Sequence, residues 1–327
     1  MEKEFAERHF IINSLLGNGL SILAGSPKVG KSWLVLDWCV RVANGENIWN
    51  LHTQKGTVLY ISLEDDENRL QNRLLSITDE VPENIHFATS CSTLEEYFEE
   101  QIKNFVSEHK DTVLIAVDTL QLIRSGKAEQ NYASDYSEIQ KLKKIADELQ
   151  ISFLAVHHLR KQSDNDPVNE ISGTNGIAGC ADAVLILKKS RRTQGNAVLY
   201  CTGRDIEDRE IELSFSKEEC TWKMMSDSAE NPNMLLPDEL NKLIEMMKDK
   251  GFFEGSNDFF IQTYNICTNQ NLSARVMKRL MNKWKYKLNE NGVFFESFRK
   301  NNVRSLIIRY VSQSDDSDIK YDKIHDL

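Results

Sequence analysis

One short stretch of the chain has the residue types and spacing of a phosphate-binding loop. The segment GSPKVGKS at residues 25–32 fits the pattern GxxxxGK[ST] and is followed by a helix-compatible run at 33–43. Glycines let backbone N–H groups curl around phosphate oxygens, and the amino end of a helix adds partial positive charge. Lys31 would reach the outer phosphates, and the Ser32 hydroxyl would ligate magnesium. The predicted triphosphate cradle consists of Gly25, Ser26, Pro27, Lys28, Val29, Gly30, Lys31, Ser32 and Trp33.

Two further apolar segments end in carboxylates that would complete such a site. Residues 112–117 are followed by Asp118, which is the arrangement expected for a carboxylate that holds magnesium. Residues 57–63 are followed by Glu64, Asp65 and Asp66, and we take Glu64 as the candidate general base for an attacking water. The structural alternatives are a helix cap at Asp118 and a solvated acidic turn at Glu64.

A fourth segment, residues 151–156, ends in His157 and His158. Adjacent side chains on a strand point to opposite faces, and no third ligand follows nearby, so a zinc site is disfavoured. His158 would instead sense a terminal phosphate and relay its loss to the polar loop at 163–176. A half-buried structural histidine is the alternative.

Arg204 lies between an apolar run at 199–202 and an alternating segment that reaches residue 211. An arginine at a strand edge would project onto the phosphates of an adjacent subunit as an arginine finger, which offsets the charge that develops in phosphoryl transfer. A surface ion pair with the surrounding acids is the alternative.

These candidate residues require a scaffold that brings several strand ends together. Before residue 226, short runs rich in β-branched residues and apolar on both faces alternate with helical stretches such as 131–150. This alternation predicts an α/β domain with a mainly parallel sheet and with ligands at the carboxyl ends of the strands. The runs are 20–24, 57–63, 112–117, 151–156 and 183–187.

A smaller pattern follows at residues 238–311. Amphipathic helices at 238–248 and 272–290 precede two strand-like runs, 293–298 and 303–311, joined by a basic turn. This order predicts an α+β winged helix-turn-helix domain that binds DNA; a basic helix in a protein contact is the alternative. Residues 275–309 hold ten basic residues and two acidic ones, although the whole chain has a net charge of −10. The candidate DNA contacts are Arg275, Lys278, Arg279, Lys283, Arg299 and Lys300.

Composition sets the expected organisation of the 327 residues. A hydrophobic content of 40% excludes a wholly disordered chain, and six scattered cysteines without a CxxC pair indicate neither a disulfide framework nor a zinc cluster. No apolar run approaches the roughly 18 residues that cross a bilayer, so we expect a cytoplasmic protein without a membrane partner. The expected parts are an N-terminal extension (1–18), an ATPase domain (19–225), a linker (226–237), the winged-helix-like domain (238–311) and a disordered acidic tail (312–327).

The order of the segments GSPKVGKS, VLYISLEDD, VLIAVDT, FLAVHHLRK, SGTNGIAGCAD and GRDIEDREIEL resembles RecA-like hexameric ATPases of the plasmid RepA replicative-helicase type. The likeness to the DnaB type is more distant. The resemblance covers about residues 19–215, and it implies a RecA-like P-loop core. It also implies a homo-oligomeric ring, usually a hexamer, with ATP between subunits and single-stranded DNA in the channel. The loop at 163–176 would contact that DNA or form a mobile surface loop.

The resemblance also implies site roles, which fall on residues of this chain. These are Lys31 and Ser32 in the phosphate loop, Glu64 as base, Asp118 at magnesium, His158 as sensor and Arg204 as candidate finger. His158 stands where DnaB-type proteins have a glutamine. We see neither a DnaB-type N-terminal collar nor a primase segment, so we expect separate primase and initiator proteins.

Two functions remain open from the sequence. The first is an ATP-dependent DNA helicase or translocase that acts in replication of a plasmid, phage or other mobile element. The alternative is a RecA-like regulatory ATPase that binds DNA through its winged helix without unwinding it. A small-molecule kinase is a weaker option because no acceptor-binding segment stands out, and a GTPase is disfavoured because no NKxD motif follows.

Overall fold

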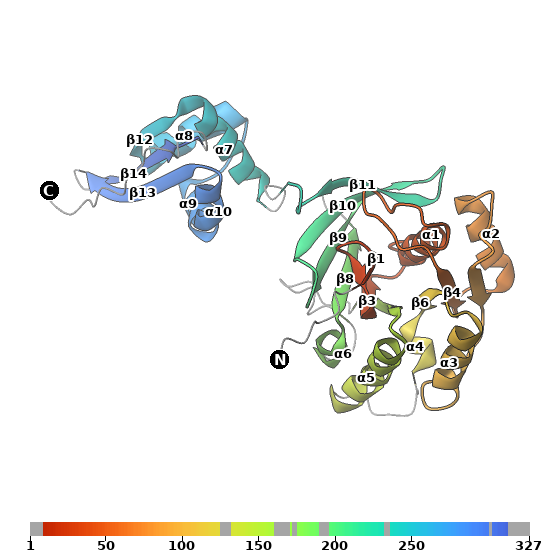
Figure 1. The fold of residues 1–327 in the computed structure, drawn as a ribbon. Helices are drawn as coiled ribbons and strands as arrows, with labels where there is room; N and C mark the ends of the chain where they lie inside the picture. The colour runs from red at the N-terminus through yellow and green to blue at the C-terminus, as the bar shows by residue number, and fades with distance from the viewer. Residues whose placement is uncertain are drawn as a thin grey trace, which may run out of the picture. The chain divides into compact units, whose positions relative to one another are not determined.

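A mixed sheet forms the centre of the first of two units, Met1–Glu230, into which the chain divides (Figure 1). The computed structural model describes residues 9–124, 132–159, 171, 175–189, 196–231, 236–300 and 303–312. Within that part of the chain, the nine strands of the sheet are β3 (Gly19–Gly25), β4 (Thr57–Ser62), β5 (Ile85–Ala88), β6 (Thr112–Asp118), β7 (Ser152–His158), β8 (Ala183–Lys189), β9 (Asn196–Gly203), β10 (Arg209–Ser216) and β11 (Thr221–Asp227).

The strand order is β11-β10-β9-β8-β3-β7-β6-β4-β5. All pairs from β8 to β5 are parallel, and the three pairs from β8 to β11 are antiparallel. The prediction of an α/β core with a mainly parallel sheet is therefore confirmed. In this arrangement, the carboxyl ends of β3, β4, β6 and β7 lie at one edge of the sheet.

Helices cover both faces of the parallel strands, which explains why those strands are apolar on both sides. In β3, Leu23 packs into the core cluster that contains Leu34 of α1 (Lys31–Asn44), while Ile22 packs into the cluster on the opposite face. Helix α2 (Glu67–Ile77) and the hairpin of β1 (Phe10–Ile12) and β2 (Leu16–Gly17) contribute to the first cluster. The second cluster receives α3 (Phe98–Glu108), α4 (Leu120–Ile123), α5 (Tyr132–Leu149) and α6 (Asn175–Cys180).

Several sequence boundaries differ from the observed elements. Residues 10–17, expected in an N-terminal extension, form the β1–β2 hairpin, whose Ile11, Ile12, Leu15 and Leu16 side chains belong to the core. Ser226 and Asp227, expected in a linker, pair with β10 as the end of β11. A buried ion pair of 3.2 Å between Arg209 and Asp227 joins the same two strands. The acidic tail from residue 313 onward and most of the loop at 163–176 lie outside the described residues.

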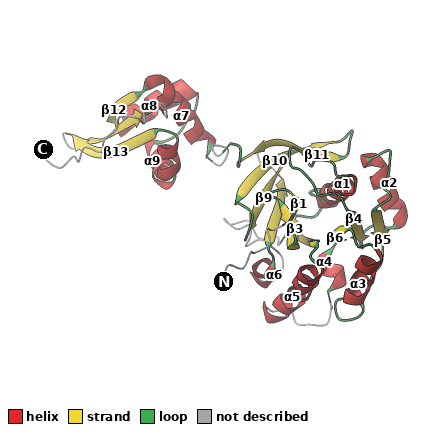
Figure 2. Cartoon of the chain, viewed as in Figure 1, coloured by secondary structure: helices red, strands yellow, loops and turns green. Residues whose placement is uncertain are grey.

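The second unit, Asn231–Leu327, combines helices with a small antiparallel sheet of order β12-β14-β13 (Figure 2). Its element order is α7 (Asp238–Lys250), β12 (Phe252–Ser256), α8 (Asn257–Thr268), α9 (Ala274–Lys283), α10 (Lys285–Glu290), β13 (Val293–Lys300) and β14 (Val303–Tyr310). The single helix expected at 272–290 is divided at Trp284, and β12 and α8 were not expected.

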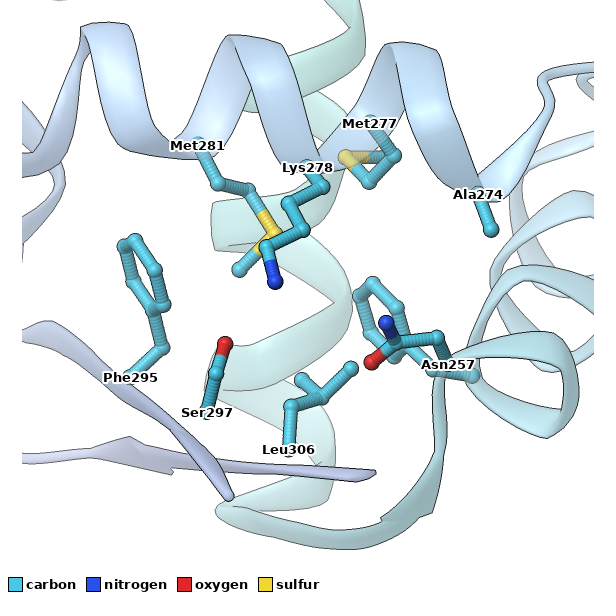
Figure 3. A pocket seen from close by; sticks show the side chains of 9 residues that line it. Asn257, Ala274, Met277, Lys278, Met281, Phe295, Ser297 and Leu306 are labelled. Carbon is cyan, nitrogen blue, oxygen red and sulfur yellow. The ribbon is translucent and has the colours of Figure 1, made fainter. Parts of the chain in front are cut away.

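Serine caps and apolar spacing set the local structure of this unit. Ser256 accepts a hydrogen bond from the Phe259 N–H and begins α8, and Ser273 accepts one from the Val276 N–H and begins α9. One face of α9 carries Met277 and Met281, which are buried against the sheet. A cavity of about 20 Å³ lies beside these methionines. Figure 3 shows side chains of α9, β13 and β14 that line it, among them Met281, Phe295 and Leu306. None of the helices within the described ranges has the length and apolar character needed to span a bilayer.

Candidate active site

The predicted phosphate loop connects β3 directly to α1. Strand β3 ends at Gly25, and α1 begins at Lys31. A Cβ atom at Gly25 would lie 2.8 Å from the Leu187 carbonyl oxygen, so the neighbouring strand leaves no room for a side chain. Gly30 has a φ of 106°, which favours glycine for backbone reasons. The two glycines of the sequence pattern are therefore both required by the geometry of the loop.

Lys31 lies beneath the loop with its ammonium group turned inward. Its Nζ donates to the carbonyl oxygens of Gly25, at 2.8 Å, and Ser26, at 3.2 Å. Burial lowers the pKa of Lys31, while the negative charges of Asp118 and Glu64 oppose that shift. A lysine has three N–H donors, so these two bonds leave one donor for an incoming anion. The arrangement suits the phosphate role expected from the sequence.

Asp118 ends β6 and is buried beside the loop. The Ser32 hydroxyl forms a hydrogen bond with its carboxylate, and the Tyr60 hydroxyl donates to Oδ2 at 3.2 Å. Burial raises the pKa of Asp118, and the hydrogen bond with Ser32 acts in the opposite direction. Ser32, in the first turn of α1, and Asp118, at the end of β6, thus come together. Their oxygen atoms fit the hard ligand set that magnesium prefers.

The three consecutive acids after β4 have three different environments. The side chain of Glu64 is half exposed, and its Oε1 lies 3.4 Å from Nε2 of His158. Asp65 is buried and forms ion pairs with Arg69, at 3.4 Å, and with Arg73. Asp66 caps α2 by accepting a hydrogen bond from the Arg69 N–H at 2.7 Å. Glu64 and Asp66 are both exposed, and of these two Glu64 is the one whose carboxylate lies next to another candidate residue, His158.

His158 occupies the last position of β7, in register with Gly25 of β3. His157 is buried, while His158 is partly exposed on the side of Glu64. Strand β7 is also tied to the strand of Asp118, because the Thr119 hydroxyl donates to the Val156 carbonyl oxygen at 2.9 Å. The expected sensor thus lies between the start of the phosphate loop and the candidate base.

Arg204 is not brought to this site in its own chain. Strand β9 runs antiparallel to β8, and Gly203 pairs with Ala183, whereas Gly25 lies next to Leu187 at the other end of β8. The side chain of Arg204 is 55% exposed, with one guanidinium nitrogen 3.8 Å from Asp182 Oδ1 and another 3.4 Å from the Gly179 carbonyl oxygen. Arg204 therefore lies at the amino edge of the sheet, opposite the phosphate loop.

Three residues near the site were missed by sequence reasoning. Besides Tyr60, Trp222 donates its indole N–H to the Gly30 carbonyl oxygen at 3.1 Å, and Arg73 lies 5.4 Å from the ring centre of Trp33. No motif marks these positions, since each partner is distant in the chain. A groove of about 460 Å³ opens beside Trp33 and is lined by Asp66, Asn68, Arg69, Asn72, Arg73 and Ser76 as well.

The candidate DNA contacts lie on a separate surface in the second unit. Arg275, Arg279 and Lys283 are exposed on α9, on the side away from its buried methionines. Lys278 is partly buried and borders the small cavity in Figure 3. Arg299 is exposed on β13, and the side chain of Lys300 lies outside the described part of the structure.

Comparisons with known proteins match this chain to an AAA domain and to replicative DNA helicases of the DnaB type. The family model described as "AAA domain" matches residues 1–164. The replicative DNA helicase DnaB of Helicobacter pylori, in strains J99 and 26695, is 23% identical over 228 residues, which cover 61% of this chain and 47% of the helicase. The chain therefore spans about half the length of the curated relatives that it matches.

A solved structure is also similar. "The Structure Of A DnaB-Like Replicative Helicase And Its Interactions With Primase" matches with a TM-score of 0.52 and 16% sequence identity, covering 63% of this chain and 57% of that chain. At this identity the likeness concerns the fold, which is the RecA-like α/β core expected from the sequence.

Proposed function

The chain belongs to the AAA-domain family of P-loop ATPases, and from this premise we propose that it is an ATP-driven DNA helicase or translocase of the RepA type. Its setting would be the replication of a plasmid, phage or other mobile element. The observation that carries the proposal is the convergence of Lys31, Asp118 and Glu64 at one edge of the sheet, where each lies at or after the end of a different strand. Lys31 is then the candidate for phosphate binding, Asp118 for metal coordination and Glu64 for activation of the attacking water.

The proposed chemistry uses the side chains as they lie. Lys31 would move from the two loop carbonyls to the phosphates of ATP, and Glu64 would accept a proton from the attacking water. Ser32 and Asp118 would hold magnesium, which neutralises phosphate charge when bound. The groove beside Trp33 has room for the nucleoside.

His158 would connect the state of the nucleotide to the rest of the domain. It touches Glu64 and lies in register with the first glycine of the phosphate loop. Loss of the terminal phosphate would alter this contact, and the change would pass to the segment that follows β7. We propose that this segment meets single-stranded DNA.

We propose a homo-oligomeric ring, usually of six subunits, with ATP between subunits. The position of Arg204 at the amino edge supports this proposal, because a finger at that edge can serve only a neighbour. Priming and loading would fall to separate primase and initiator proteins.

We further propose that the second unit is a winged helix-turn-helix domain that binds duplex DNA. The element order α7-β12-α8-α9-β13-β14, with α10 as a short extension of α9, and the sheet order β12-β14-β13 support this assignment. Helix α9 would enter the major groove, and the turn between β13 and β14 would meet phosphates. The exposed basic side of this helix also favours the second candidate function, a regulatory ATPase that binds DNA without unwinding it.

A strand-displacement assay on forked DNA separates these two functions. Lys31→Ala should abolish both ATP hydrolysis and displacement, because the buried ammonium group is lost from the phosphate loop. Lys103→Ala is the matched control, since Lys103 pairs with Glu99 on α3 and should leave both activities intact. Hydrolysis by the unmodified protein without displacement on any forked substrate would favour the regulatory ATPase. No hydrolysis and no nucleotide binding would contradict both.

A further inference from the structure

Strand β11 lies at one end of the sheet, and its Trp222 side chain reaches the phosphate loop. Trp222 is almost completely buried, and its Nε1–H donates to the carbonyl oxygen of Gly30 at 3.1 Å. The two residues are 192 positions apart. A Cβ atom added at Gly30 would lie 2.9 Å from Cζ2 of the indole, so the ring occupies the space of a missing side chain.

The carbonyl oxygen of Gly30 accepts a second hydrogen bond, and together the two bonds fix the orientation of this carbonyl. It also accepts the N–H of Leu34 at 3.1 Å, in the first turn of α1. A carbonyl oxygen has two lone pairs, and here the indole and the helix use both. The peptide unit is planar, so a fixed Gly30 carbonyl also fixes the direction of the Lys31 N–H, which points the opposite way. That N–H is among the helix-end donors that face a bound phosphate.

The indole is itself held by neighbours. The Trp49 indole N–H donates to the carbonyl oxygen of Trp222 at 2.7 Å, which ties the backbone of β11 to the loop after α1. The ring of Phe215 lies 5.1 Å from that of Trp222, and Trp33 follows at 6.3 Å from Phe215. Trp222 therefore has a fixed position from which to orient the Gly30 peptide.

We propose that Trp222 is a positioning residue of the phosphate loop: its indole N–H aims the Gly30–Lys31 peptide so that the Lys31 amide faces the phosphates of the nucleotide. The inference rests on the proposed nucleotide binding and adds a residue from the far end of the sheet to that site. It assigns Trp222 no contact with the nucleotide.

Trp38 provides a matched control for a purely structural role. It is fully buried in the core cluster that also contains Trp222, and its Nε1 has no hydrogen-bond partner in the described part of the chain. Trp38→Phe and Trp222→Phe therefore remove the same atoms from buried sites, but only the second change removes a bond to the loop. If packing alone matters, the two variants should behave alike.

The test is calorimetric titration of the full chain with ATP, ADP and adenosine. Trp222→Phe should weaken ATP and ADP binding by roughly three- to tenfold, as expected for one hydrogen bond, and leave adenosine binding unchanged. Trp38→Phe should bind all three ligands as the unmodified protein does. Its thermal midpoint should fall by an amount similar to that of Trp222→Phe. Trp49→Phe, which loosens the backbone of Trp222, should show a smaller loss and serves if Trp222→Phe does not fold.

The possible outcomes distinguish the positioning role of Trp222 from the proposed function of the chain. If the unmodified protein binds ATP and both Trp222→Phe and Trp49→Phe bind it equally well, the positioning role is wrong and the proposed function stands. An equal loss in Trp38→Phe would also overturn the positioning role. If the unmodified protein has no affinity for ATP, the proposed function itself fails.

Discussion

His158 and Glu64 lie 94 positions apart in the chain, yet the imidazole Nε2 is 3.4 Å from the carboxylate Oε1. We expect Glu64→Gln to keep this contact and to lose the proton acceptor. ATP turnover should then fall by about 100-fold or more, while ATP affinity stays within about twofold. Phosphate release at saturating ATP and calorimetric binding measure the two effects.

Asp66→Asn is the control for Glu64→Gln. An asparagine still caps α2, so turnover and stability should remain near those of the unmodified protein. Normal turnover in Glu64→Gln would remove Glu64 as the base. Asp65, the next acid in the chain, would then be a poor replacement because Arg69 and Arg73 hold its carboxylate.

Asp118→Asn should lose most of its magnesium-dependent turnover and should also be more stable than the unmodified protein. Burial raises the pKa of Asp118 above its ordinary value, so the native state binds a proton there more tightly than the unfolded state does. Because the pKa of Asp118 is higher in the folded state, the free energy of unfolding falls as the pH rises from the unfolded-state pKa through the folded-state pKa. Above that range the ionised carboxylate destabilises the native state. Without magnesium and nucleotide, the asparagine variant should melt at a higher temperature at pH 7.

Thermal unfolding at several pH values tests this prediction. The stabilisation of Asp118→Asn should shrink on acidification, when Asp118 itself becomes neutral. Magnesium-dependent turnover should drop by about 100-fold or more, since a neutral amide is a weak magnesium ligand. A lower melting temperature at neutral pH, or normal turnover, would contradict the assigned role.

The sequence predicted those parts of the site that depend on local spacing. The loop at 25–32 and the acids that follow β4 and β6 lie at strand ends, and a parallel sheet brings such ends together. Long-range partners could not be predicted in this way. Tyr60 reaches Asp118 over 58 positions, and no periodicity marks that pairing.

Local propensity also failed at specific elements of the second unit. Strand β12 contains Gly255 and is only five residues long, so its apolar pattern is too short to detect. Helix α8 exposes Phe259 and Ile266, and this blurs the difference between its two faces. The break at Trp284 between α9 and α10 is not marked in the sequence, because residues 274–290 contain neither glycine nor proline.

Arg204→Ala should be rescued by mixing with Lys31→Ala. Each variant alone should hydrolyse ATP poorly, because one lacks the finger and the other lacks the phosphate lysine. In random mixed rings, about a quarter of the interfaces combine an intact Lys31 with an intact Arg204 from the neighbour, so activity should return toward that fraction. The rate of phosphate release, measured as a function of the mixing ratio, reports this recovery. If the mixtures hydrolyse ATP no faster than the separate variants, the assignment of Arg204 as a finger is wrong.

Charge removal on α9 should weaken duplex binding and its dependence on salt. Arg275→Ala and Arg279→Ala should each reduce the slope of log affinity against log salt by about 0.9 if each residue meets one phosphate. Lys242→Ala is the control, since Lys242 pairs with Asp238 on α7 at 2.9 Å. Fluorescence anisotropy at several salt concentrations provides the slopes.

A truncation tests the same surface as a whole. Ending the chain after Pro237 should leave ATP hydrolysis in place and remove most of the salt-sensitive binding to duplex DNA. Unchanged duplex binding in the truncated protein would contradict the winged-helix assignment.

Because β9 returns antiparallel to β8, the two margins of the sheet differ in the groups that they carry. The carboxyl margin of the sheet carries the phosphate loop, and the opposite margin carries Arg204. Under the proposed role of Arg204, a neighbouring copy must therefore bring its amino margin to the carboxyl margin that carries the phosphate loop. A heterologous contact that repeats in one sense around a closed ring does this for every copy. The reversal of a single strand thereby fixes which two margins must meet in the proposed assembly.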